Sequence, residues 1–129
     1  MACDAAGRAL AFALVPGPRS ELLAADLLLA RVWPLGPFGV VTCDRGYSSK
    51  AWRACISAYG AAPCVPANRT HPEVAYDRGA YRRRNRVERL WGRLKEWRCV
   101  ATRYEETASS FAGVLYAAAA LDWIDSILT

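Results

Sequence analysis

The chain has 129 residues, of which 53% are hydrophobic and 22% charged, enough for one globular domain and unlike the composition of a disordered protein. Its net charge is +5 at pH 7, but residues 78–103 hold ten basic residues against two glutamates, a local charge of +8, so the rest of the chain carries −3. A concentrated basic segment is typical of proteins that bind a polyanion, with nucleic acid as the first candidate.

Length and spacing argue against several other classes of protein. The longest apolar run, residues 111–121, stops at Asp122, short of the roughly 20 residues that cross a bilayer, so we expect no membrane span. No signal peptide is visible after Met1. The five cysteines are odd in number and form no CxxC pair, which indicates neither a zinc site nor a disulfide framework and favours a reduced, cytoplasmic protein.

The first part of the chain predicts a hairpin, a strand and a helix. Asp4 to Gly7 has the composition of a tight turn, and a strand from Arg8 to Val15 follows until Pro16 stops it. Ser20 can cap a helix over residues 21–32, whose leucines and alanines are apolar almost all round.

The middle of the chain predicts a buried strand that ends at a carboxylate. "FGVVTC", residues 38–43, is a short apolar and β-branched run directly before Asp44. A helix from about Lys50 to Tyr59, capped by Ser48 or Ser49, and a short strand in "APCVP" come next.

The last part predicts a loop over residues 66–79 and then two helices, residues 80–98 and 106–128. His71 stands alone in that loop beside a proline, and we give it no catalytic role. The second helix is rich in alanine and apolar on most sides, which favours a buried packing helix. The order of elements predicts an α/β architecture with helices packed on a small mixed sheet.

The helix predicted at residues 80–98 carries one glutamate in an organised position. At ~100° per residue, Tyr81, Arg84 and Lys95 share with Glu88 a stripe about 60° wide. Beside this stripe lies an apolar arc that we expect to face the core, formed by Val87, Leu90, Trp91, Leu94 and Trp97. The remaining side carries Arg82, Arg86, Arg89 and Arg93. The simplest explanation of the stripe is a weak ion pair between Arg84 and Glu88 at i, i+4.

Asp44 offers a second explanation, because ligands collect at the carboxyl ends of strands in α/β sheets. If the helix packs across that edge, Asp44 and Glu88 converge within a basic surface, roughly 4–8 Å apart. Carboxylate oxygens hold Mg²⁺ or Mn²⁺, and such ions activate water and stabilise the oxygens of a phosphodiester. The flanking arginines and lysine would then bind the phosphates on either side.

The spacing of these residues resembles a known signature. Tyr81, two residues, Arg84, three residues, Glu88, six residues and Lys95 reproduce the Y-(2)-R-(3)-E-(6)-K pattern of bacterial insertion-sequence transposases with a DDE site, and resemble the insertion sequence five group in particular. "DRGY" at residues 44–47 resembles the turn that bears the second catalytic aspartate of that family, and "DAAGRALAFALVPG" resembles the preceding hairpin. The resemblance covers essentially the whole chain.

The resemblance implies a ribonuclease-H-like fold in which two aspartates and a glutamate bind two divalent ions, Mg²⁺ or Mn²⁺. Asp44 and Glu88 would be catalytic metal ligands. Tyr81, Arg84 and Lys95 would contact DNA near the scissile phosphate. Apart from the resemblance, we also expect DNA contacts from Arg82 and Arg89 on the basic side of the helix. In the family the first catalytic aspartate lies on a strand upstream of the hairpin with which this chain begins, whereas Asp4 matches the hairpin turn. Residues 1–129 therefore read as a single partial catalytic domain, truncated at its N-terminus and with an incomplete triad.

Three hypotheses remain open at this stage. The first is a transposase fragment for DNA cleavage and strand transfer at insertion-sequence ends, inactive alone, and either normally joined to an upstream reading-frame product or a decayed copy. The second is a non-catalytic DNA-binding or regulatory protein that inhibits or assembles onto full-length transposase. The third is an α/β domain with a coincidental charge stripe. The first two imply DNA as partner, no membrane, and a cytoplasmic, nucleoid-associated location in a bacterium.

Overall fold

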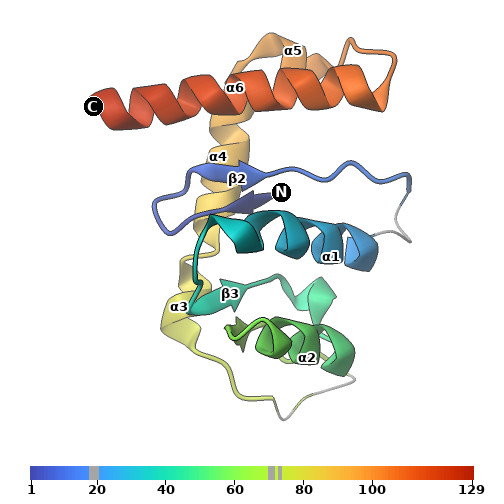
Figure 1. Ribbon diagram of the computed structural model, residues 1–129, viewed down its shortest axis with the longest axis vertical. Coiled ribbons are helices and arrows are strands. Elements are labelled where there is room, and N and C mark those ends of the chain that lie inside the picture. The colour runs from blue at the N-terminus through green and yellow to red at the C-terminus, as the bar shows by residue number, and fades with distance from the viewer. Residues whose placement is uncertain (18–20, 70–71, 73) are drawn as a thin grey trace. The chain divides into compact units, whose positions relative to one another are not determined.

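The computed structural model describes residues 1–17, 21–69, 72 and 74–129, so the predictions for Ser20 and His71 lie outside the described residues. Short strands and helices alternate along the first half of the chain, and helices make up the second half, as Figure 1 shows. The prediction of a mixed α/β protein is confirmed. In chain order the elements are β1 (Ala2–Cys3), β2 (Ala9–Ala11), α1 (Glu21–Val32), the 3-10 turn η2 (Trp33–Leu35), β3 (Val40–Thr42), the 3-10 turn η3 (Arg45–Tyr47), α2 (Lys50–Ala58), β4 (Ala62–Cys64), α3 (Arg78–Arg82), α4 (Asn85–Glu96), α5 (Arg98–Thr102) and α6 (Ala108–Leu128).

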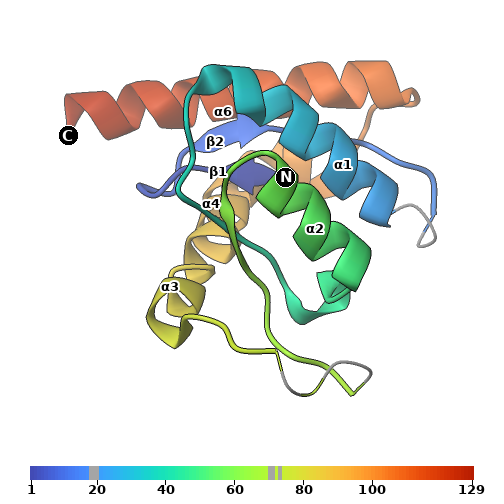
Figure 2. The ribbon, with the colours of Figure 1, turned by 60° about the horizontal axis from the view of Figure 1, so that its bottom comes forward.

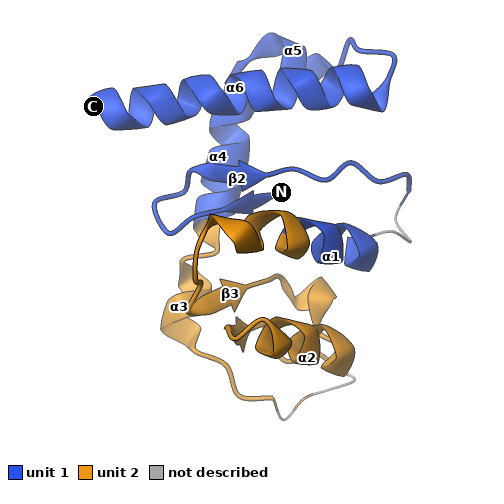
Figure 3. Ribbon diagram, in the orientation of Figure 1, with its two compact units in different colours: residues 1–28, 86–129 blue, residues 29–85 orange. Residues whose placement is uncertain are grey.

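The chain forms two compact units, coloured separately in Figure 3. Unit 1 comprises residues 1–28 and 86–129, and unit 2 comprises residues 29–85. Strand β1 pairs with β2 antiparallel in unit 1, and β3 pairs with β4 parallel in unit 2. The prediction of one small mixed sheet is wrong for the described residues, because each strand finds its hydrogen-bonding partner within its own unit.

The hairpin of unit 1 begins with the predicted turn. The Gly7 N–H donates to the Asp4 carbonyl at 3.0 Å, and Gly7 has φ +82°, a conformation that glycine adopts without steric cost. Strand β2 is shorter than predicted. Its ladder stops after Ala11, and the next N–H, that of Phe12, lies 3.4 Å from the Tyr116 hydroxyl of α6. A side chain thus replaces the strand partner that a longer ladder would have required.

The core of unit 1 is centred on α4. Leu90 and Leu94 are fully buried, as the apolar arc predicts, and Val87 and Trp91 are half-buried. The buried cluster around them consists of Ala9, Phe12, Leu90, Leu94, Val100, Phe111, Leu115, Ala118 and Ala119. Trp97 contradicts the prediction with 42% exposure, because α4 ends at Glu96 and Trp97 leaves the helix to flank the start of α5.

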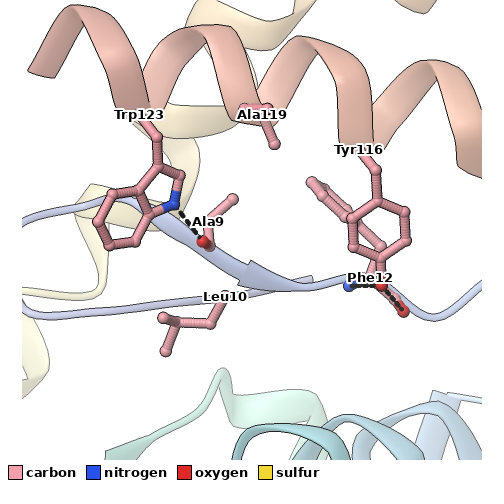
Figure 4. Close-up of a pocket in the computed structure, with 7 residues that line it drawn as sticks. Ala9, Leu10, Phe12, Tyr116, Ala119 and Trp123 are labelled. Atoms are coloured by element: carbon pink, nitrogen blue, oxygen red, sulfur yellow. Dashed lines mark hydrogen bonds between the residues drawn. The ribbon is translucent and has the colours of Figure 1, made fainter. Parts of the chain in front are cut away.

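Helix α6 packs on the hairpin through two aromatic side chains. Figure 4 shows Trp123 and Tyr116 pointing from α6 toward β2. The Trp123 Nε1–H donates to the Ala9 carbonyl at 2.6 Å, and the Tyr116 ring meets that of Phe12 edge to face at 5.2 Å. A cavity of about 180 Å³ remains between them, lined by Ala9, Leu10, Phe12, Tyr116, Ala119, Ala120 and Trp123.

The rest of α6 is far more exposed than predicted. Its buried residues are Phe111, Leu115, Ala118 and Ala119. Three apolar residues toward its C-terminus are 43%, 51% and 69% exposed: Leu121, Ile124 and Ile127. The prediction of a buried packing helix is wrong, because the contacts of α6 with the hairpin and α5 use one stripe of the helix and leave its other sides uncovered.

By length and composition alone, α6 could cross a membrane, since it has 21 residues and a mean hydropathy of 1.4 over its most apolar stretch. The argument from the length of the apolar run is therefore wrong, because Asp122 interrupts the run without ending the helix. Such a helix is weak support for a membrane span, since core helices of globular proteins meet the same criteria. Here the stripe around Leu115 does pack into the core of unit 1.

Strand β3 of unit 2 is less buried than predicted. Val40 is 52% exposed, because β4 is the one strand that pairs with β3 among the described residues, and parallel strands become buried where helices cover both faces. Helix α2, the green helix in Figure 2, packs on β4. The Ser49 Oγ accepts from the Trp52 N–H at 3.1 Å, so Ser49 is the cap of α2.

The single helix predicted at residues 80–98 is interrupted. Asp77 caps α3 by accepting from the Gly79 and Ala80 N–H groups. Helix α3 then ends at Arg82, and the N–H groups of Arg83 and Arg84 donate three residues back along the chain instead of four. This tighter bonding closes the last turn, and α4 begins anew at Asn85.

Candidate nucleic-acid and metal site

Asp44 follows β3 after one intervening residue, Cys43, and stands at the start of a tight turn, so the prediction of a carboxylate at the carboxyl end of this strand is confirmed. Its Oδ1 accepts from the Arg45 N–H at 2.7 Å, and its carbonyl accepts from the Tyr47 N–H at 3.0 Å. The carboxylate thereby caps η3. Its side chain is 56% exposed, so it is open to a ligand from solvent.

Tyr81 and Arg84, the first two residues of the signature, lie beside this carboxylate in unit 2. The Tyr81 hydroxyl donates to Asp44 Oδ1 at 3.4 Å, and the Arg84 Nη1 lies 3.9 Å from Asp44 Oδ2. The Arg84 guanidinium also lies over the Tyr81 ring, 5.6 Å from its centroid. The helix break brings this about, because it removes Tyr81 and Arg84 from any stripe continuous with α4.

The surroundings of Tyr81 favour the neutral phenol, which can donate a hydrogen bond. Burial raises the pKa of its phenol; the Arg84 cation opposes this, while the charge of Asp44 and the hydrogen bond to it raise the pKa further. Tyr76, which no sequence pattern singled out, meets the Tyr81 ring edge to face at 5.7 Å. This contact orients the phenol of Tyr81. The one hint of it in the sequence is that two tyrosines stand five positions apart.

Glu88 and Lys95 lie on α4, in unit 1. Both are exposed, seven residues apart on the same helix, and the Lys95 ammonium lies 5.3 Å from the centre of the Trp91 ring. Because Asp44 belongs to unit 2, its predicted approach to Glu88 stays a prediction. The two explanations of Glu88, as a metal ligand or as the ion-pair partner of Arg84, both stay open.

Two arginines on the basic side of α4 have a structural role that sequence reasoning missed. Arg93 makes a double contact with Asp122 of α6, from Nε at 2.6 Å and from Nη2 at 3.0 Å, and also donates to the Gly7 carbonyl at 2.8 Å. Arg86 donates to the Ala5 carbonyl. Both therefore hold the hairpin turn against α4. Arg82 and Arg89, which we predicted as DNA contacts, are exposed.

The described residues thus define a mixed α/β protein with an exposed carboxylate held among tyrosine and arginine side chains and with a strongly basic helical segment. Comparisons with known proteins identify the family. Residues 41–125 match the family model described as "Transposase DDE domain". The protein named "Putative transposase for insertion sequence element IS6501" from Brucella ovis is 30% identical over 123 residues, which cover 94% of this chain and 92% of that protein. No solved structure matches this chain. The chain belongs to the transposase DDE domain family.

Transposases with a DDE domain depend on divalent metal ions, so the carboxylates of this chain can be tested as ligands. Asp44 has the hard oxygen donors and the exposure that Mg²⁺ requires. In the part of the chain that the structure describes, however, no group of three or more histidine, cysteine, aspartate or glutamate residues is arranged to hold a metal ion. The donor chemistry of Asp44 itself fits a divalent ion.

Proposed function

We propose that this chain is part of the ribonuclease-H-like catalytic domain of an insertion sequence five group transposase, with Asp44 and Glu88 as two of its three metal-binding carboxylates. The observation that carries the proposal is the contact of Tyr81 and Arg84 with Asp44. The first two residues of the signature lie at the very carboxylate that the family pattern assigns to metal binding. A coincidental charge stripe gives no reason for that convergence.

Three of the five aspartates other than Asp44 are engaged in structural contacts, which supports an incomplete triad. Asp4 is engaged in the hairpin turn, Asp77 caps α3, and Asp122 pairs with Arg93. None of these three is available as the first catalytic aspartate without loss of a structural contact. We therefore propose two origins for the incomplete triad. Either the first carboxylate is supplied by an upstream segment that frameshifting joins to this chain in a longer product, or the chain is a decayed copy that has lost it.

The residues of this chain bind and orient the DNA in this proposal. Arg84 and Tyr81 hold the phosphate beside Asp44, while Arg82, Arg89 and Lys95 contact phosphates along the basic segment. Asp44 and Glu88 would be two of the ligands of divalent ions, which in a complete site would supply an activated water and stabilise charge on the phosphodiester oxygens. Two carboxylates do not fix that coordination, so we propose that the 129-residue chain alone does not cleave DNA.

A second candidate function is regulation without catalysis. It is favoured by the incomplete triad, together with the intact basic segment. In that case the chain binds insertion-sequence ends, or full-length transposase, and lowers transposition. Both candidates place the protein on DNA in the bacterial cytoplasm, at the nucleoid, and not in a membrane.

A cleavage assay on DNA that carries the ends of the element tests the proposal. The proteins compared are this chain, a longer product that includes the upstream strand and its aspartate, and that product with Glu88→Gln or with the control Glu96→Gln, an exposed glutamate at the end of the same helix. We expect Mg²⁺- or Mn²⁺-dependent cleavage by the longer product and by Glu96→Gln, and a loss of at least 100-fold, about 2.7 kcal/mol of barrier, in Glu88→Gln.

Cleavage by the 129-residue chain alone would overturn the incomplete triad, and full activity of Glu88→Gln would overturn the assignment of Glu88. Adding the 129-residue chain to the longer product separates the two candidates. A dose-dependent fall in cleavage favours the regulatory function.

A further inference from the structure

A basic hollow lies in unit 2, and one of its lining residues, Arg45, directly follows Asp44 in the sequence. It has a volume of about 690 Å³ and is lined by Arg45, Ala67, Asn68, Arg69 and Pro72. Both charged side chains in this described lining are arginines, and both are exposed. They come from two separate segments, the turn that carries Asp44 and the connection after β4.

A network of hydrogen bonds joins these two segments. Arg53 of α2 donates from Nη2 to the Ser48 Oγ at 2.9 Å, and also to the Val65 and Pro66 carbonyls at 2.8 and 3.2 Å. The Asn68 amide donates to the Ser48 carbonyl at 3.1 Å. Ser48 itself is buried, with 7% exposure, so the junction is a fixed part of unit 2.

This junction determines how the two lining arginines are presented. Because Arg53 bonds backbone carbonyls next to Ala67, and Asn68 bonds the end of the turn, the backbone on either side of the hollow is tied together. Side chains held on fixed backbone lose less conformational entropy when they bind than side chains on a free loop. The hollow is therefore prepared to receive a ligand at Arg45 and Arg69.

The chemistry of the lining selects an extended anion. Pockets for small molecules enclose their ligand, whereas this hollow is open and carries two guanidinium groups and one amide beside Ala67 and Pro72. Guanidinium groups bind phosphate oxygens in a bidentate manner. Arg45 directly follows Asp44, so phosphates bound here continue the DNA path away from the candidate metal-binding carboxylate.

We propose that the hollow binds phosphates of the DNA backbone next to Asp44, with Arg45 and Arg69 as contacts and Arg53 as a positioning residue. The inference rests on the proposed function, because it takes DNA as the ligand. It adds a second phosphate-binding surface, separate in sequence from the basic segment at residues 78–103.

The first test measures binding of a short fluorescein-labelled duplex by the full chain over a series of KCl concentrations. Arg45→Ala and Arg69→Ala should each lower the slope of log K against log salt by roughly 0.9, and the double variant by about twice that, because each loses one phosphate contact. Arg31→Ala removes the same charge from an exposed position of unit 2 and should leave the slope unchanged. Equal slopes for the double variant and the wild type would overturn the inference, as would an equal loss in Arg31→Ala.

The second test locates the DNA by phenylglyoxal modification of arginines, read by mass spectrometry. The duplex should protect Arg45 and Arg69 in the wild type. Arg53→Lys keeps the charge but lacks the planar fork that serves several acceptors, so protection of Arg69 should fall while protection of Arg84 persists. Protection of Arg84 without that of Arg45 and Arg69 would overturn this inference alone, whereas failure of the wild-type chain to bind the duplex would overturn the proposed function as well.

Discussion

Asp4 shows how a single side chain sets the geometry of the first hairpin. Its Oδ1 accepts from the N–H groups of Ala6 and Arg8, each at 2.9 Å, and its Oδ2 pairs with the Arg8 guanidinium at 2.7 Å. The same guanidinium lies over the Trp123 ring, 4.2 Å from its centroid. One carboxylate therefore connects the turn to α6 through Arg8.

Replacing Asp4 with asparagine should destabilise the protein in a pH-dependent way. Burial opposes ionisation of Asp4, but hydrogen bonds from the Arg8 backbone and side chain and from Ala6 outweigh it and lower the pKa below its ordinary value of 3.8. A lowered pKa in the folded state stabilises the protein above the unfolded pKa, and this stabilisation is lost as pH falls through the folded pKa. We expect Asp4→Asn to cost about 1 kcal/mol at pH 6 and close to nothing once the pH falls below the folded pKa.

Urea unfolding of both proteins between pH 2 and pH 7, within the range in which carboxylates titrate, measures this difference. Asparagine has nearly the same size and shape as aspartate and keeps an oxygen that can accept from the N–H groups of the turn, so the variant changes mainly the charge. A difference in stability that is constant over the whole pH range would show that the charge of Asp4 has no role.

Individual residues of the candidate site were predictable where local chemistry decides. The Asp4 turn and the position of Asp44 after β3 follow from turn-forming residues next to apolar runs, and both are confirmed. Arg93 was not predictable, because its partner Asp122 lies 29 positions away and no local pattern connects the two.

At the scale of elements, the break between α3 and α4 matters most for the site. Sequence periodicity runs through residues 80–98 without a proline, and its one glycine, Gly92, lies well beyond the break, so one helix was the natural prediction. The structure ends α3 at Arg82 and turns Tyr81 and Arg84 toward Asp44. Contacts of these two side chains with a distant turn are available only in the folded chain, which is why periodicity did not reveal them.

Arg93 should act as a clamp between α4, α6 and the hairpin. Replacing it with alanine removes the double contact with Asp122 and the bond to the Gly7 carbonyl, and leaves the largely buried Asp122 carboxylate without this partner. Because Arg93 is 43% exposed, solvent screens the pair, and we expect a loss of about 1 to 2 kcal/mol.

Chemical unfolding of Arg93→Ala beside Arg89→Ala checks this expectation. Arg89 is an exposed arginine four residues earlier on the same helix, and its replacement should change the stability by less than about 0.5 kcal/mol. The clamp would be refuted by equal stabilities of the two variants.

At the scale of the whole molecule, the uneven charge should govern DNA binding. With +8 concentrated in residues 78–103, affinity for duplex DNA should fall by roughly 0.9 log unit per log unit of salt for each phosphate neutralised. Replacing both Arg84 and Lys95 with alanine should flatten this dependence by about two phosphate contacts. Arg93→Ala serves as the matched control, since its charge is already paired with Asp122 and should contribute little. An unchanged slope in the Arg84 and Lys95 double variant would remove both residues from the DNA surface.

The sequence alone determined the mixed α/β class and the transposase family, because these depend on local composition and on fixed spacings along the chain. It also determined that charge gathers in one segment. Tertiary structure decided which partners the residues of that segment find: Arg86 and Arg93 bind the hairpin, while Tyr81 and Arg84 lie at Asp44. It also decided that α6 exposes much of its apolar surface. The physical reason is the same in each case: a side chain's role depends on which distant groups fold against it, and burial and pairing between such groups leave no periodic trace in the sequence.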